Sequence, residues 1–312
     1  MQFRFVFAVT ALILFSGCWK CSEARAAASV DKDPIHMTVT AESPHGYDPP
    51  AIARDDVMVH EGSARDKVTE WIPAQGTHAG LELFVLIDDS ANTTLGSQLE
   101  EIRQFINSQP ASTRVGVAYM QNGVAQIVQN LTSDHTQAAK SLRLPMGIPG
   151  GEASPYFSLD DLIKRWPESN SRREVVMISD GIDRLWGSGP DDPYVSSAIE
   201  KAQRAGVLVY AIYTPGVGHY GRSFWRTWWG QIDLSRVADE SGGESYYIGF
   251  YGPPVSFAPY LDEVKHRLDH QYLLTFEAQS RNKAGLQRVK ITTEEPNVEL
   301  VSADSFYVPA QP

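Results

Sequence analysis

The segment from residue 81 to about residue 250 alternates short, strongly apolar runs with amphipathic stretches, and this pattern constrains the fold more than any other feature. The apolar runs at 81–87, 174–179 and 207–213 show no polar alternation, which is typical of strands covered on both faces. Apolar residues between them recur at helical spacing, and strands that alternate with helices pair in parallel through βαβ crossovers. The pattern predicts an α/β protein with a doubly wound, mainly parallel, Rossmann-like sheet.

A hairpin interrupts this alternation. The runs 115–120 and 124–129 flank Asn122-Gly123, a pair that favours the tight turn of a β-hairpin. One antiparallel edge strand is therefore expected on the parallel sheet.

Shorter β-type runs flank the core. We expect a small β-rich segment at 36–76, punctuated by prolines and glycines, and a C-terminal β unit at 271–312 that packs on or beside the core. The core domain itself is assigned to 80–270, and 27–35 is interpreted as a polar linker.

Residues 1–26 are typical of a secretory signal peptide. Their apolar run at 5–15 is too short to cross about 30 Å of hydrocarbon as a helix. Two processing routes remain open: cleavage after the small-x-small sequence at 24–26, or acylation of Cys18 in a lipobox-like sequence at 14–18. Both predict an exported protein of the periplasm, cell envelope or extracellular space, with a lipid anchor in the second case.

Composition excludes several classes of function. The chain has 27 Lys and Arg against 38 Asp and Glu, a net charge of −11, so we expect no nucleic-acid partner held through its phosphates. Its 2 cysteines, Cys18 and Cys21, lie near the N-terminus and exclude a disulfide framework and a cysteine-based zinc ribbon. No later stretch approaches about 18 apolar residues, so no transmembrane helix is expected in the mature chain.

Polar residues follow the core strands at the edge where open α/β sheets concentrate function. Asp88-Asp89-Ser90-Ala91-Asn92 comes directly after the first core strand, and Asp180-Gly181-Ile182-Asp183 comes after the strand at 174–179. Gly150-Gly151-Glu152-Ala153-Ser154 lies between them in the sequence. Oxygen atoms from three loops are therefore expected to meet at one edge of the sheet.

At these positions the chain resembles a von Willebrand factor A-type domain. The metal-ion-dependent adhesion site of that family uses Asp-x-Ser-x-Ser after the first strand, a Thr in a later loop and the Asp of a Thr-Asp-Gly turn. Such a set suits Mg²⁺, which takes about six oxygen ligands at roughly 2.1 Å. The resemblance implies a divalent cation with one open position, which an acidic residue of a protein partner would fill.

The match to this motif is partial. Asp88, Ser90 and Asp180 agree with it, whereas Asn92 stands in place of the second Ser. The Thr position falls on Ser154, or on Glu152 if the Gly-Gly pair is aligned instead, and we prefer Ser154 because it keeps a hydroxyl. The resemblance thus implies a cation held by Asp88, Ser90, Asn92, Ser154 and Asp180, with Asp89, Glu152 and Asp183 close by. In the alternative, the site has decayed and its two aspartates only cap helices and turns.

The resemblance extends over roughly residues 36–310 to the bacterial VWFA-related (acidobacterial-type) domain proteins. These have a β segment before the core and a β tail after it. The biochemical function of this family is largely unassigned, so the resemblance implies a fold and a site rather than a biological process.

An aromatic stretch at 215–231, expected to be a loop, offers a second candidate surface. Its large side chains could form a recognition surface with Arg222 and Arg226, since Trp, Tyr and Arg dominate interface hot spots. They could instead fold back and cap the sheet or cover the β tail, which the helical spacing of the tryptophans slightly favours. The residues are Tyr220, Phe224, Trp225, Trp228 and Trp229.

Other chemistry is weakly supported. His266 and His270 are four residues apart on an expected helix, but the HExxH pattern is absent, so we expect histidines that face solvent rather than a zinc site. No GxSxG or Walker motif is present, and a GxGxxG match at 216–221 is rejected because it comes late in the fold, without the helix and the ribose-binding acid of a dinucleotide site. A metal-assisted hydrolase using Asp88 and Asp180 ranks a distant third.

The sequence therefore predicts an exported, non-catalytic, adhesion-type protein-binding module with a partly degenerate metal site. The alternative is a structural envelope protein with an inactive metal site that binds through its aromatic stretch.

Overall fold

A computed structural model describes residues 34–147, 153–186, 189, 191–218, 223–278 and 284–309. Its core sheet has the strand order β6-β5-β4-β7-β8-β9. All pairings are parallel except that of β6, which is antiparallel to β5. The predicted doubly wound, mainly parallel sheet with one antiparallel edge strand is confirmed. The strands are β4 (Leu81–Asp88), β5 (Thr113–Gln121), β6 (Val124–Thr132), β7 (Arg172–Ser179), β8 (Val207–Tyr213) and β9 (Ser245–Tyr246).

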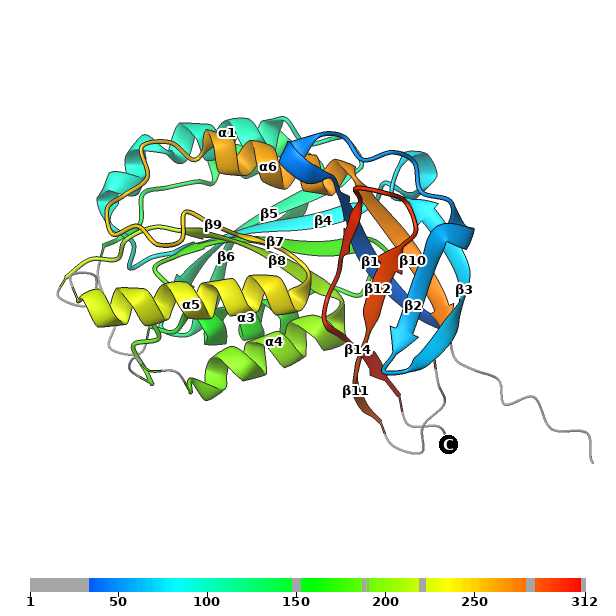
Figure 1. Ribbon diagram of the computed structural model, residues 1–312. Coiled ribbons are helices and arrows are strands. Elements are labelled where there is room, and N and C mark those ends of the chain that lie inside the picture. Colours follow the sequence, from blue (N-terminus) through cyan, green and yellow to red (C-terminus); the bar gives the residue numbers. More distant parts are fainter. Residues whose placement is uncertain are drawn as a thin grey trace, which may run out of the picture. The chain divides into compact units, whose positions relative to one another are not determined.

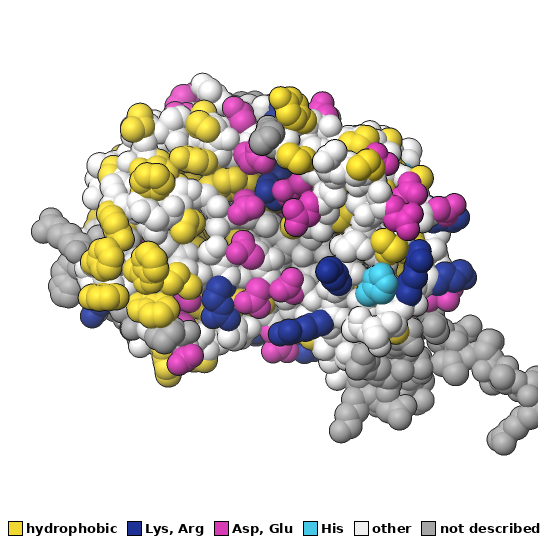
Figure 2. All heavy atoms as spheres, viewed as in Figure 1, with side chains coloured by type: hydrophobic (Ala, Val, Ile, Leu, Met, Phe, Trp, Pro, Cys, Tyr) yellow, Lys and Arg dark blue, Asp and Glu magenta, His cyan; other side chains and the backbone are white. Residues whose placement is uncertain are grey.

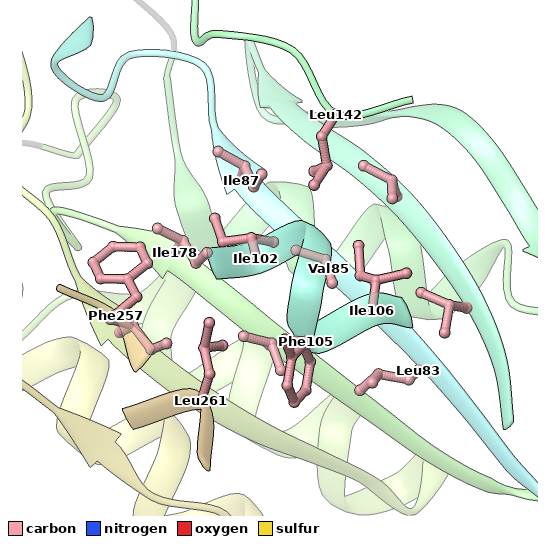
Figure 3. Packing of buried hydrophobic residues seen from close by; sticks show 14 of the residues in the cluster. Leu83, Val85, Ile87, Ile102, Phe105, Ile106, Leu142, Ile178, Phe257 and Leu261 are labelled. Atoms are coloured by element: carbon pink, nitrogen blue, oxygen red, sulfur yellow. The ribbon is translucent and has the colours of Figure 1, made fainter. Parts of the chain in front are cut away.

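Helices cover both faces of this sheet (Figure 1). One face carries α1, α2 and α6, whose apolar residues form one cluster with alternate residues of the core strands; Figure 3 shows Phe105 and Ile106 close to Leu83 and Val85 of β4. The other face carries α3, α4 and α5. Every residue of β4 is buried, as its nearly unbroken apolar run predicts. The helices are α1 (Leu99–Asn107), α2 (His135–Lys140), α3 (Pro155–Lys164), α4 (Pro193–Ala205), α5 (Phe224–Ser241) and α6 (Ala258–Asp269), with 3-10 turns η1 (Pro44–Gly46), η2 (Arg54–Asp56), η3 (Gly76–His78) and η4 (Thr93–Ser97).

A second sheet joins strands from both β-rich additions. Its order is β12-β2-β3-β10-β1-β13, so β10, which directly follows α6, lies between two strands of the N-terminal segment. Trp71 of β3 stacks on Tyr272 of β10 with ring centroids 4.4 Å apart. The strands are β1 (Pro34–Glu42), β2 (Val57–Glu61), β3 (Ala64–Pro73), β10 (Gln271–Glu277), β12 (Lys290–Thr293) and β13 (Glu299–Val301); β11 (Gly285–Arg288) and β14 (Ser305–Val308) form a separate pair.

The local turn and helix predictions divide into one that is confirmed and one that is partly wrong. Asn122 and Gly123 turn the β5–β6 hairpin with φ values of 51° and 70°. The stretch expected to be a loop at 215–231 is helical from Phe224 onward, because α5 begins there. Thr227 and Gly230 are buried while Trp225 is exposed, so this part of the helix has an inner face of small residues that an apolar-periodicity argument misses.

The sequence makes two predictions about membranes: no transmembrane helix in the mature chain, and a signal peptide with Cys18 as a possible site of acylation. In the part of the chain that the structure describes, no helix is long and apolar enough to span a membrane. The signal peptide and Cys18 lie outside the described residues and remain predictions.

Candidate functional site

The loops at the carboxyl ends of the core strands are held together by main-chain hydrogen bonds. The amide of Asn92, after β4, donates to the carbonyl of Pro215, after β8, over 2.9 Å. The amide of Arg184, after β7, donates to the carbonyl of Ala153, just before α3, over 2.8 Å. The loops that carry the predicted site residues therefore meet at one edge of the sheet.

Asp88 ends β4 and is buried with both carboxylate oxygens engaged. Its Oδ1 accepts hydrogen bonds from the Ser90 hydroxyl at 2.7 Å and the Ser90 amide at 2.8 Å. Its Oδ2 accepts from the hydroxyl of Ser179, the last residue of β7, at 2.7 Å. These three residues form one hydrogen-bonded group that links the ends of the two central strands.

Asp180 faces a buried arginine. Arg184 Nη2 lies 2.6 Å from Asp180 Oδ2, and the two side chains are only 2% and 1% exposed. The amide of Ile182 donates to Asp180 Oδ1 at 2.9 Å. Burial raises the pKa of Asp180 to about 6 against the lowering effect of Arg184, and the nearby charge of Asp88 contributes to this rise. The two aspartates therefore lie close enough to interact electrostatically.

This arrangement does not fit a hard cation bound at Asp180. The guanidinium of Arg184 already supplies the positive charge, and a divalent ion would have to displace it from the carboxylate. Gly216 makes room for the pair, because a Cβ at this position would lie 2.0 Å from Asp180 Oδ2 and 2.7 Å from Arg184 Nη2. The residues present fit an internal ion pair in the place where the resemblance implies a metal.

The other predicted ligands have separate partners. Asn92 accepts a hydrogen bond from the Thr94 amide at 3.0 Å and caps η4. The hydroxyl of Ser154 donates to Asp183 and accepts from the Phe157 amide at 3.2 Å, which caps α3. The five residues thus share one edge of the sheet but are divided among separate hydrogen-bonded groups. Glu152 lies outside the described residues, and a cation held by this set remains a prediction.

Asp89 also pairs with an arginine. Arg143 Nη1 and Nη2 lie 2.7 and 2.9 Å from its two carboxylate oxygens, and the hydrogen bonds to Asp89 raise the pKa of Arg143. The guanidinium also lies 3.8 Å from the ring centroid of Tyr119. Sequence reasoning missed both arginines. The four-residue spacing between Asp180 and Arg184 was visible, but nothing marked it as a buried pair.

A set of exposed rings, here called the aromatic surface, consists of Phe224, Trp225, Trp228, Phe250 and Tyr251. Trp225 is 69% exposed and Phe224 is 53% exposed. Phe224 lies 5.3 Å from Tyr251 and 5.4 Å from Trp225, centroid to centroid, so the helix start and the 250–251 loop form one continuous surface. Figure 2 shows hydrophobic side chains gathered at the end of the molecule where α5 begins. Trp229 is partly buried, and Tyr220 lies outside the described residues.

The aromatic surface borders the loops that carry the aspartates. A Cβ on Gly181, which has φ +70°, would lie 2.1 Å from the carbonyl oxygen of Gly230, so α5 packs directly on the turn after Asp180. Gln231, one residue further, holds the 249–250 loop by accepting from the Gly249 amide at 2.7 Å. The aromatic side chains are therefore presented on a rigid support beside the site.

No protein-family model and no curated protein sequence matches this chain. Among solved structures, an aerotolerance-related membrane protein from Bacteroides fragilis aligns at a TM-score of 0.45 and 15% identity, over 61% of this chain and 99% of that one. Manganese-loaded TRAP protein from Plasmodium vivax aligns at 0.40 and 12%, over 78% and 98% of the two chains. The SpRpn10 VWA domain aligns at 0.38 and 13%, over 58% and 93%. The core has the α/β topology that the resemblance to A-type domains implies.

Proposed function

We propose that this protein is a non-catalytic binding module that docks a protein partner on its aromatic surface, at the carboxyl edge of the core sheet, without a divalent cation. The observation that carries the proposal is a continuous surface of exposed rings beside a buried acidic site that is neutralised from within. This combines the adhesion-type function predicted from the sequence with the inactive metal site of its alternative.

Exposed rings of this size are costly to leave in water. Large apolar patches on a soluble protein mark interaction sites, and Trp and Tyr dominate the energetics of interfaces. Trp225 and Trp228 are adjacent on one face of α5, and their helical support limits the entropy lost on binding.

The acidic site is poorly suited to catalysis. Asp88 accepts hydrogen bonds from Ser90 and Ser179, and Asp180 is paired with Arg184, all of them buried. A general base needs a free carboxylate that can reach a substrate proton. This supports a non-catalytic role over the metal-assisted hydrolase.

The cation-dependent alternative requires a rearrangement of the acidic site. In it, Arg184 moves aside, Mg²⁺ or another divalent cation binds the five predicted oxygen ligands, and an acidic residue of the partner completes the shell. Capture of the partner would then need the cation, whereas docking on the aromatic surface would not.

The test is affinity capture from an envelope extract of the producing cells, with captured proteins quantified by mass spectrometry. The baits are the wild type, the Trp225→Ser/Trp228→Ser double variant and Tyr47→Ser, whose exposed ring lies outside the aromatic surface. We expect one set of proteins that is kept by Tyr47→Ser and by EDTA treatment but lost by the double variant. Equal capture by the double variant would refute the proposal, and loss with EDTA and with Asp88→Ala would support the cation-dependent alternative.

Export is part of the proposal, because envelope or extracellular surroundings suit a binding module with the predicted leader. Mass spectrometry of the mature N-terminus distinguishes the two processing routes. A chain that starts near Ala27 indicates simple cleavage, and an acylated N-terminal Cys18 indicates a lipid anchor.

A further inference from the structure

Two histidines and an aspartate converge at the end of α6, far from the aspartates of the acidic site. His266 lies in the last turn of α6, His270 follows the helix, and Asp48 belongs to the segment between η1 and η2. Asp48 Oδ1 lies 3.2 Å from His266 Nε2 and 3.5 Å from His270 Nε2. The three side chains offer one ligand atom each, and these atoms all lie within 4.8 Å of one another. Among the described residues, no other group of three or more His, Cys, Asp and Glu side chains lies this close together.

The hydrogen bond at Nδ1 of His270 determines which ring nitrogen carries the proton. His270 Nδ1 lies 2.8 Å from the carbonyl oxygen of His266, and because a carbonyl only accepts, Nδ1 must carry the proton. In the neutral ring Nε2 then holds a lone pair, and this lone pair faces a carboxylate oxygen. Two acceptors that face each other need either a proton or a metal cation between them.

The spacing matches that of a metal ion with nitrogen and oxygen ligands. Tetrahedral ligands bound at about 2.0–2.1 Å are about 3.3 Å apart, close to the two distances from Asp48 Oδ1. A ligating histidine commonly donates its second ring N–H to a backbone carbonyl, as His270 does. The side chains of His266 and His270 are 26% and 22% exposed and that of Asp48 is 82% exposed, so an ion can enter from solvent.

We infer that Asp48, His266 and His270 form a binding site for a transition-metal ion of borderline softness, and that the ion bound in the cell is Zn²⁺. Two imidazoles and one carboxylate favour such ions over Mg²⁺, which prefers oxygen ligands throughout. The three protein ligands leave a position for water or for a ligand from outside. The ion also joins the segment after β1 to the end of α6, and thereby fastens the N-terminal β addition to the core. This revises the expectation that the two histidines only face solvent, and it does not depend on the proposed function.

The test is calorimetric titration of Zn²⁺ into the purified, metal-stripped protein without a histidine tag, paired with thermal unfolding. We expect one high-affinity Zn²⁺ per chain and a higher midpoint temperature with Zn²⁺. Asp48→Asn and His270→Gln should each weaken binding at least tenfold and remove the thermal shift. His78→Gln, which removes an exposed histidine elsewhere, should change neither.

Two results would overturn the inference. One is Zn²⁺ binding that is equally tight in the wild type, Asp48→Asn and His270→Gln. The other is a wild type that takes up no Zn²⁺. Destabilisation by Asp48→Asn only at acidic pH would then show that the group is an ion pair between Asp48 and protonated histidine. Because Asp48 is exposed and Asn has nearly its shape, that variant keeps the test valid if His270→Gln folds poorly.

Discussion

The charged groups compared here at the two edges of the core sheet differ in their exposure to solvent. At the carboxyl edge, Asp180 and Arg184 are buried and neutralise each other at 2.6 Å. At the amino edge, Arg172 at the start of β7 donates to the carbonyl of Leu268 at 3.0 Å, and the adjacent end of α6 carries the partly exposed group of Asp48, His266 and His270. At the carboxyl edge Arg184 neutralises Asp180, whereas the amino edge carries the three side chains inferred above to bind a metal ion.

This difference in exposure determines where an ion can bind and dissociate. A buried ion pair resists loss of either member, because the remaining charge has no solvent around it. A partly exposed ligand group can gain or lose an ion without leaving a charge buried in the core. The edge that resembles a metal site is therefore the edge at which a metal is least needed.

The largest expected effect comes from breaking the buried pair. Arg184→Met leaves Asp180 uncompensated beside Asp88 and should lower the free energy of unfolding by about 3–5 kcal/mol. Urea denaturation at neutral pH measures it. Arg54→Met, which removes an exposed partner of Asp55, is the control and should cost less than about 0.5 kcal/mol. Equal costs for the two variants would contradict the comparison.

The next effect depends on pH. Asp233 is buried with Oδ1 lacking a hydrogen-bond partner within the described part of the chain, and burial together with Asp192 raises its pKa from 3.8 to about 7. The folded state therefore holds a proton that the unfolded state releases, and the stability from this group is lost as pH rises from about 4 through about 7. Between pH 5 and pH 8 the free energy of unfolding of Asp233→Asn should therefore rise relative to that of the wild type by on the order of 2 kcal/mol. A constant difference across denaturation curves at both pH values would count against this.

An intermediate effect is expected at Arg143, whose side chain is 37% exposed while its partner Asp89 is buried. Arg143→Met removes two charge-assisted hydrogen bonds and the contact with Tyr119, but solvent can reach the space left behind. We expect a loss of about 1–2 kcal/mol in chemical denaturation, between those of Arg184→Met and Arg54→Met. A loss as large as that of Arg184→Met would show that exposure does not govern these pairs.

The smallest effect is expected at the amino edge in the absence of metal. Asp48→Asn removes a charge from an exposed site and should change the free energy of unfolding of the metal-stripped protein by less than about 0.5 kcal/mol. Chemical denaturation in the presence of EDTA measures it. A loss above about 2 kcal/mol would mean that Asp48 is already part of the folded framework and that the two edges do not differ as described.

The sequence predicted the fold well because its pattern is strong. The nearly unbroken apolar run of β4 and the Asn122-Gly123 turn each specify local structure through burial or backbone conformation. α5 was harder, because its first turns present Trp225 and Trp228 to solvent and small residues to the core. Composition alone cannot tell an exposed aromatic helix face from a loop.

The candidate site was predictable in position but not in pairing. Asp88 and Asp180 follow central strands, and that placement brings their loops together. Whether Asp180 meets a cation or Arg184 depends on the course of the turn after β7 and on the absence of a Cβ at Gly216. Likewise, His266 and His270 acquire Asp48 only through the fold, since the aspartate lies more than 200 residues earlier.

The most direct test of the central claim is calorimetric titration of Mg²⁺ into the purified wild type, with Asp88→Ala as the control. If Arg184 supplies the positive charge at the carboxyl edge, the wild type gives no saturable Mg²⁺ binding and the two proteins give the same trace. Binding of one Mg²⁺ per chain that Asp88→Ala abolishes would contradict the claim.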